Sequence, residues 1–167
     1  MYTNNKVGNV IYKVIEYFGD DVRRINHFLK VYGYVKMIGE CENLDDSMQE
    51  ILEVTAVLHD VGIKVAEQKY NSSAGHYQQL EGPPVAKKIL DELGYPDDFV
   101  ERVMYLIAHH HTYINIDGMD YQILVEADFL VNADEDRLSS DAIENFKEKI
   151  FKTTTGIAVL ENNYLNL

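Results

Sequence analysis

The chain is organised around residues 56–64, which read Ala56-Val57-Leu58-His59-Asp60-Val61-Gly62-Ile63-Lys64. From Ser47 onward, apolar or small side chains recur at the helical spacing of a buried face, and His59 continues that spacing seven residues after Leu52. A buried carboxylate needs a hydrogen-bond network, an opposite charge or a metal ion. We therefore expect His59 and Asp60 to lie together at the buried end of a helix, which Gly62 ends as a C-terminal cap.

Length and composition predict one folded domain over residues 1–167, because the chain is 46% hydrophobic and 26% charged. The first residues lack the basic start and apolar centre of a secretory signal, and no apolar run is long enough to span a membrane. The single Cys41 cannot form an internal disulfide, which agrees with a reducing compartment. We expect a cytoplasmic protein that does not interact with membranes.

The net charge of -13 excludes long nucleic acids as partners, because their affinity comes largely from Lys and Arg on phosphates. A small anionic substrate remains compatible with this charge if a bound metal ion makes the cleft locally positive.

The hydrophobic spacing predicts an all-α bundle, with little strand-like alternation anywhere in the chain. In the second helix we expect Val22, Ile25, Leu29 and Tyr32 to face the core, with His27 at the edge of that face. Residues 64–82 are expected to form a long polar loop, and such loops are often functional. Besides the helix that leads to His59, helices are expected at 7–18, 21–39, 83–93, 97–109, 118–133, 139–153 and 156–165.

Several of these buried faces carry a side chain that can bind a metal ion. Taken alone, each has a simpler interpretation, such as a hydrogen-bonded core histidine or a solvated residue at a helix end. Taken together they favour a metal site, because all six histidines of the chain fall in or next to these positions. His111 is expected to lie further round its helix and to be exposed. The candidates are His27, His59, Asp60, His109, His110 and Asp128, with His76 in the polar loop.

These residues resemble a known pattern. His27, the pair His59-Asp60, and Asp128 within Glu126-Ala127-Asp128-Phe129-Leu130 are similar to the H…HD…D signature of the HD-domain superfamily of metal-dependent phosphohydrolases. The resemblance spans roughly residues 26–132. It implies a single-domain, all-α helical bundle of the HD-domain type and one metal ion held by these four side chains.

Members of this superfamily with two metal ions add histidines between the HD pair and the last Asp. His76 and His109-His110 resemble those extra ligands, and Asp60 would then bridge both ions.

One subfamily is disfavoured. In the cyclic-dinucleotide phosphodiesterases with an HD-GYP signature, a Lys follows the HD pair by three positions, whereas here Ile63 stands there and Lys64 follows. No Gly-Tyr-Pro follows the histidines.

The ligand types predict the cofactor and the reaction. Imidazole and carboxylate ligands suit one or two divalent transition metal ions, Fe, Mn, Co, Ni or Zn. Such an ion lowers the pKa of a bound water and neutralises charge on a phosphoryl oxygen. We therefore expect a phosphohydrolase that cleaves a phosphoester of a nucleotide or other small phosphorylated metabolite by attack of metal-bound hydroxide.

Other side chains are candidates for contacts with the substrate. Lys64 can hold a phosphate oxygen, although an exposed solubilising lysine is an equally good interpretation. Ser72 and Ser73 either contact the substrate or turn the loop. A histidine of the pair at 109 and 110 that is not a ligand, for example His110, can protonate the leaving group.

Two other functions fit the same ligand types. Some proteins that resemble this superfamily use a di-iron centre to activate dioxygen, so a di-iron oxygenase stays open. A non-catalytic metal-binding regulatory module is the third alternative, and the intact ligand set argues against it. The substrate, the metal and the oligomeric state are left open by the sequence.

Overall fold

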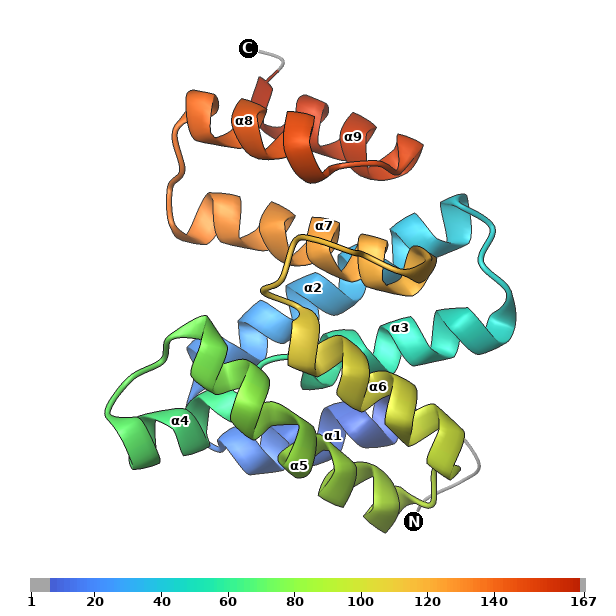
Figure 1. The fold of residues 1–167 in the computed structure, drawn as a ribbon, viewed down its shortest axis with the longest axis vertical. Helices are drawn as coiled ribbons and strands as arrows, with labels where there is room; N and C mark the ends of the chain where they lie inside the picture. Colours follow the sequence, from blue (N-terminus) through green and yellow to red (C-terminus); the bar gives the residue numbers. More distant parts are fainter. Residues whose placement is uncertain (1–6, 166–167) are drawn as a thin grey trace.

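The computed structural model describes residues 7–165, where all regular structure is helical and no strand occurs (Figure 1). The predicted all-α fold is therefore confirmed. No helix within this range is long and apolar enough to cross a bilayer. The elements are α1 (Val7–Phe18), α2 (Val22–Cys41), α3 (Asp46–Leu58), α4 (Gly62–Tyr70), α5 (Gly75–Leu93), α6 (Asp97–His109), α7 (Gly118–Glu135), α8 (Ser140–Ile150), α9 (Thr154–Leu160) and the π-helix η1 (Glu161–Leu165).

Helix α2 runs through the middle of the bundle and packs against α1, α3, α7 and α9 (Figure 1). The predicted core face of this helix was wrong at Val22 and Leu29, which are 59% and 36% exposed, whereas Ile25 and Tyr32 are partly buried against the core. Apolar residues surround much of the helix, so the spacing fits more than one stripe. His27 lies on the face that is buried, together with Phe28, Val31, Val35 and Ile38.

Two hydrophobic clusters meet at α3. One joins α3 to α2, α7 and the C-terminal helices, and it includes Leu52 and Ala56. The other joins α3 to α1, α5 and α6, and it includes Val57 and Leu58. Because the end of α3 is enclosed by both clusters, the next residue, His59, has no exposed surface.

The predicted loop at 64–82 was wrong, since only residues 71–74 separate α4 from α5. Helix α4 is mostly polar, so its spacing gave no sign of a buried face. The predicted start of α5 at Pro83 was also wrong, because α5 begins at Gly75 and keeps Pro83 and Pro84 inside it. A proline removes one intrahelical hydrogen bond and normally marks a helix start. Here α5 packs against both α4 and α6, which supports the helix across the two prolines.

The prediction that Gly62 caps α3 was wrong. Gly62 instead begins α4 with an ordinary negative φ. A Cβ at this position would come within 2.6 Å of the carbonyl oxygen of Gln78 and the amide nitrogen of Gly82. Glycine is therefore required for the close approach of the α4 and α5 backbones, directly after Asp60.

The C-terminal helices are attached to α7 through the buried side chain of Glu126. Its Oε1 accepts hydrogen bonds from the backbone amides of Lys152 at 2.7 Å and Thr153 at 3.0 Å. Gln122 donates to the same oxygen at 2.7 Å. Because Glu126 lies two residues before Asp128, this network also fixes the part of α7 that carries Asp128.

Candidate metal centre

The pair His59 and Asp60 lies where α3 ends and the chain turns into α4. The His59 ring is fully buried, and its Nδ1 donates to the carbonyl oxygen of Ala56 at 2.7 Å. This hydrogen bond leaves Nε2 of His59 as the free acceptor of the ring. Oδ2 of Asp60 lies 3.4 Å from that Nε2, so the two adjacent side chains face one point.

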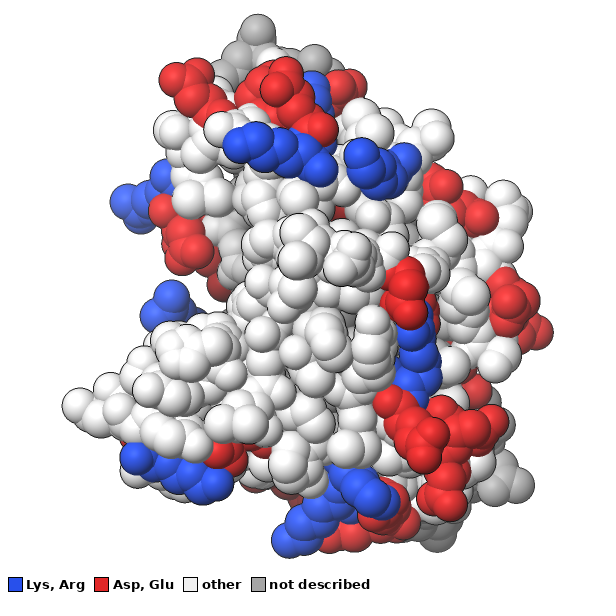
Figure 2. Space-filling view, viewed as in Figure 1, with Lys and Arg blue, Asp and Glu red and all other residues white. Residues whose placement is uncertain are grey.

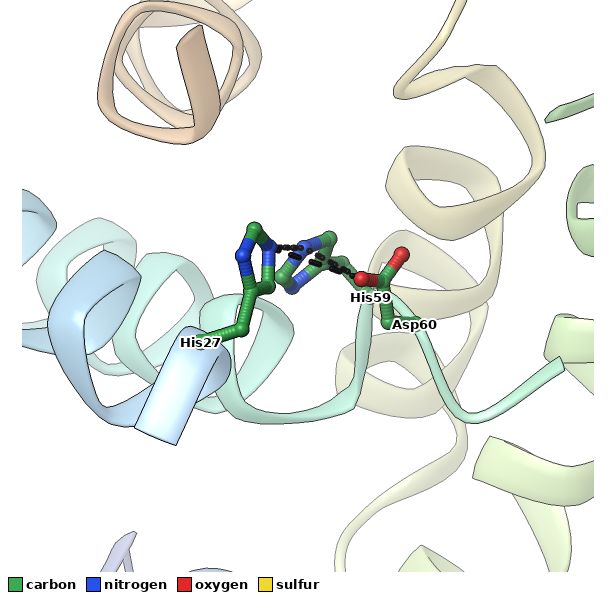
Figure 3. Close-up of side chains that lie close together, drawn as sticks. All are labelled: His27, His59 and Asp60. Atoms are coloured by element: carbon green, nitrogen blue, oxygen red, sulfur yellow. Dashed lines mark hydrogen bonds and ion pairs between the residues drawn. The ribbon is translucent and has the colours of Figure 1, made fainter. Parts of the chain in front are cut away.

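His27 reaches this pair from α2 (Figure 3). Its Nε2 lies 3.3 Å from Nε2 of His59 and 3.5 Å from Oδ2 of Asp60. Its Nδ1 lies 2.9 Å from Oε2 of Glu135, whose other oxygen accepts from Lys30 at 3.1 Å. Glu135 therefore holds the Nδ1 proton of His27 and leaves Nε2 facing the pair.

Asp128 completes this first group from α7. Its Oδ1 lies 3.2 Å from Nε2 of His27 and 3.4 Å from Nε2 of His59. The residue is only 5% exposed. The structure thus brings the four residues of the H…HD…D pattern together from α2, from the turn after α3 and from α7.

A second group forms between Asp60 and the end of α6. Nε2 of His110 lies 3.6 Å from Oδ1 of Asp60, while its Nδ1 donates to the carbonyl oxygen of Ile107 at 2.7 Å. That buried Nε2 has no hydrogen-bond partner among the described residues. The ligand atoms of Asp60, His110 and His111 all lie within 4.8 Å of one another. Burial and the neighbouring His110 lower the pKa of His111 to about 4, so its ring is neutral at pH 7 and can act as a ligand.

The acceptor nitrogens and carboxylates of the first group face one another, so this arrangement needs a positive charge among them. With both Nδ1 protons held elsewhere, His27 and His59 present acceptor nitrogens to each other. Burial alone would lower the pKa of His59, but the carboxylates of Asp60 and Asp128 outweigh it and raise that pKa to about 9. Burial alone would raise the pKa of Asp128, but hydrogen bonds from His27 and His59 hold it well below its usual range. A proton can supply the charge, and a divalent transition metal ion fits the same donors.

A pocket of about 480 Å³ opens onto both groups, and His27, Asp60, His111 and Asp128 line it. Its wall continues over the start of α2, the loop before α5 and the end of α7. Figure 2 shows the surface hollowed on the left of the view, between α7 and the segment that joins α4 to α5. Five carboxylates and two guanidinium groups line the pocket, so its lining carries a net negative charge.

Two of the predicted ligands of a second ion lie outside both groups. His76 is exposed, and its ring contacts the ring of Tyr77, with 3.9 Å between their centroids. His109 donates from Nδ1 to the carbonyl oxygen of Tyr105 at 2.7 Å. Because His109 lies one position before His110, its ring leaves α6 on a different side.

Of the three residues predicted to contact the substrate, one lines the pocket and two do not. Lys64 donates to the carbonyl oxygen of Tyr17 at 2.9 Å and is not among the residues that line the pocket. The hydroxyl of Ser72 accepts from the amide of Ala74 at 3.2 Å and so turns the loop. Ser73 does line the pocket.

Two residues of the site were not expected from the sequence. His111 is half-buried and lines the pocket, whereas the sequence had placed it on the exposed side of its helix. Glu135 was not considered, although it follows Asp128 by seven residues and therefore lies on the same face of α7. That spacing was the signal that could have identified it.

Comparisons with known proteins agree with this geometry. The model of the family described as HD domain matches residues 24–145. A comparison with curated proteins finds no match. Among solved structures, a predicted HD superfamily hydrolase from an uncultured Thermotogales bacterium is 22% identical, with a TM-score of 0.63 over 93% of this chain and 82% of that one. That likeness shows a shared fold. Because the family model covers more than half of the chain, including His27, the HD pair and Asp128, the chain belongs to the HD domain family.

Proposed function

We propose that this protein is a metal-dependent phosphohydrolase that cleaves a phosphoester of a nucleotide or another small phosphorylated metabolite. The observation that carries the proposal is the convergence of imidazole acceptors and carboxylates from different helices beside one pocket. Membership of a superfamily of generally metal-dependent hydrolases supports the hydrolytic part. The phosphate ester and its small size are our inference from the chemistry of the site.

The chain can hold one or two ions. His27, His59, Asp60 and Asp128 would hold the first, and His110 and His111 would hold a second that shares Asp60. A bound ion lowers the pKa of a coordinated water and neutralises charge that builds on a phosphoryl oxygen. Fe, Mn, Co, Ni and Zn all suit these ligands.

The electrostatics of the pocket favour an order of binding. Carboxylates outnumber guanidinium groups in its lining, so a free phosphate ester is repelled while a divalent cation is attracted. Each bound ion then adds two positive charges and favours an anionic substrate. A volume of about 480 Å³ suits a small molecule, and the net charge of -13 disfavours long nucleic acids.

Hydrolysis adds one water across the ester. The water oxygen bonds to phosphorus, the P–O bond to the alcohol breaks, and the proton that the water loses ends on the alcohol oxygen. In a form with one ion, Nε2 of His110, which has no hydrogen-bond partner within residues 7–165, can accept this proton and return it to the leaving oxygen. In a form with two ions, His110 would be a ligand instead. Lys64 is assigned no role, because its ammonium group donates to the Tyr17 carbonyl.

The test is a panel of phosphorylated compounds incubated with protein loaded anaerobically with each candidate metal. We expect release of inorganic phosphate or of a phosphorylated product from at least one small ester. Visible absorption that changes on addition of oxygen, with no phosphate released, would support an oxygenase and overturn the proposal. Tight metal binding with neither activity would point to a regulatory module.

A further inference from the structure

The pocket has two arginines in its wall, Arg23 and Arg24, both in the first turn of α2. Both terminal nitrogens of the Arg24 guanidinium group form ion pairs with carboxylates. Its Nη1 lies 2.8 Å from Oδ2 of Asp21, and its Nη2 lies 2.5 Å from Oε1 of Glu67. Arg24 therefore ties α2 to α4, and two carboxylates already balance its charge.

Arg23 is in a different position. Its side chain is exposed, and it makes no ion pair or hydrogen bond within residues 7–165. It precedes His27 by four residues, so both side chains leave the same face of α2. Its guanidinium group is therefore available to a ligand in the pocket beside His27.

The lysines near the pocket, unlike Arg23, already donate hydrogen bonds to other groups of the protein. Lys30 donates to Glu135 at 3.1 Å, and Lys64 donates to the carbonyl oxygen of Tyr17 at 2.9 Å. Among the described residues that line the pocket, Arg23 is thus the basic side chain whose charge is not already paired. In an acidic pocket, such a group is the natural contact for the anionic part of a substrate.

We propose that Arg23 binds the phosphoryl group of a phosphate monoester and gives the enzyme a preference for monoesters over diesters. The inference rests on the proposed function. A guanidinium group binds two oxygens of one phosphate through parallel N–H donors. A monoester has three non-bridging oxygens, enough for the metal and for both donors of Arg23. A diester has only two, so one bound to the metal leaves Arg23 a single partner.

The experiment compares Arg23→Gln with Lys88→Gln in the metal-loaded, full-length protein. Each change removes one positive charge from an exposed side chain without an ion pair in the described structure, and Lys88 lies on α5 away from the pocket lining. The probes are p-nitrophenyl phosphate and bis(p-nitrophenyl) phosphate, which release the same chromophore. For Arg23→Gln we expect the KM of the monoester to rise about tenfold. We expect kcat and metal content close to wild type, a smaller rise in the KM of the diester than in that of the monoester, and no change in Lys88→Gln.

An unchanged monoester KM in Arg23→Gln would overturn the inference, and so would an equal loss toward the diester or an equal loss in Lys88→Gln. If the wild type cleaves neither ester, the proposed function itself is called into question. Calorimetric titration of inorganic phosphate into the metal-loaded protein then tests Arg23 separately. Weaker phosphate binding in Arg23→Gln than in Lys88→Gln supports the contact. Equal binding in the two variants, or no binding in the wild type, contradicts it.

Discussion

Three consecutive histidines at the end of α6 have three different surroundings. His109 donates to the Tyr105 carbonyl, His110 is 1% exposed beside Asp60, and His111 lines the pocket. Successive residues on a helix point about 100° apart, so the rings of His109 and His110 leave α6 on different sides. The chain then turns directly after α6, which brings the His111 ring back toward Asp60.

The first prediction separates these histidines. We expect His111→Ala to lower the bound metal by about one ion per chain, because it removes a ligand of the second group. We expect His109→Ala, two residues earlier in the chain, to keep the wild-type metal content. Elemental analysis after dialysis measures both. Equal metal content in the two variants would show that His111 is not a ligand.

A second prediction concerns Glu135, which accepts the Nδ1 proton of His27. Carboxylates in this position orient a ligating imidazole and increase its basicity, so we expect Glu135→Gln to weaken metal binding about 10- to 100-fold. Glu148→Gln is the matched control, because Glu148 is exposed on α8. Competition with a chromogenic chelator gives both affinities. Similar affinities in the two variants would remove Glu135 from the metal centre.

Sequence alone could identify the residues whose chemistry conflicts with their position. His59 continues an apolar stripe, and Asp128 falls on the buried face of a helix. Each is a polar side chain at a buried position and therefore needs a compensating partner. Glu135 lies between Asp134 and Asp136 in an acidic helix end, where nothing about its type is unusual. Its role depends on which face of α7 meets α2, and that is a property of the packing.

Among the elements, the contact between α4 and α5 is the one that depends on a single glycine. We expect Gly62→Ala to lower the free energy of unfolding by about 1–3 kcal/mol, because the new methyl group meets backbone atoms that cannot rotate away. Gly33→Ala is the control, since a Cβ there has nothing within 4 Å and lies inside α2. We expect that control to gain about 0.5–1 kcal/mol. Urea denaturation measures both, and a neutral Gly62→Ala would show that α4 and α5 can separate without cost.

The elements also show where hydrophobic spacing is informative. Helix α1 was predicted at residues 7–18 and found there, because Val10, Val14 and Phe18 form one buried stripe. Helix α4 buries only Gly62, Ile63 and Ala66, too few to produce a periodic signal. It is helical because it packs against α5, and such tertiary support cannot be seen in a local window.

For the whole molecule, the metal centre adds a further link between three helices, α2, α3 and α7, that already share one hydrophobic cluster. His27 comes from α2, Asp128 from α7, and the HD pair from the end of α3, where both clusters meet. An ion bound to all of them acts as a cross-link that exists only in the folded state. Without it, the acceptors and carboxylates of the centre depend on protons for their positive charge.

Metal removal should therefore destabilise the whole fold. A ligand that binds only the folded state stabilises it by about 2.7 kcal/mol at one hundred times its Kd. For a chain of this size we expect chelation to lower Tm by roughly 5–10 °C. Differential scanning calorimetry with and without a chelator measures the shift. The Asp60→Asn variant, which loses the carboxylate shared by both groups, should melt at the same temperature in both conditions. A wild-type Tm that does not respond to chelation, or an Asp60→Asn variant that responds as strongly as the wild type, would mean that no ion connects these helices.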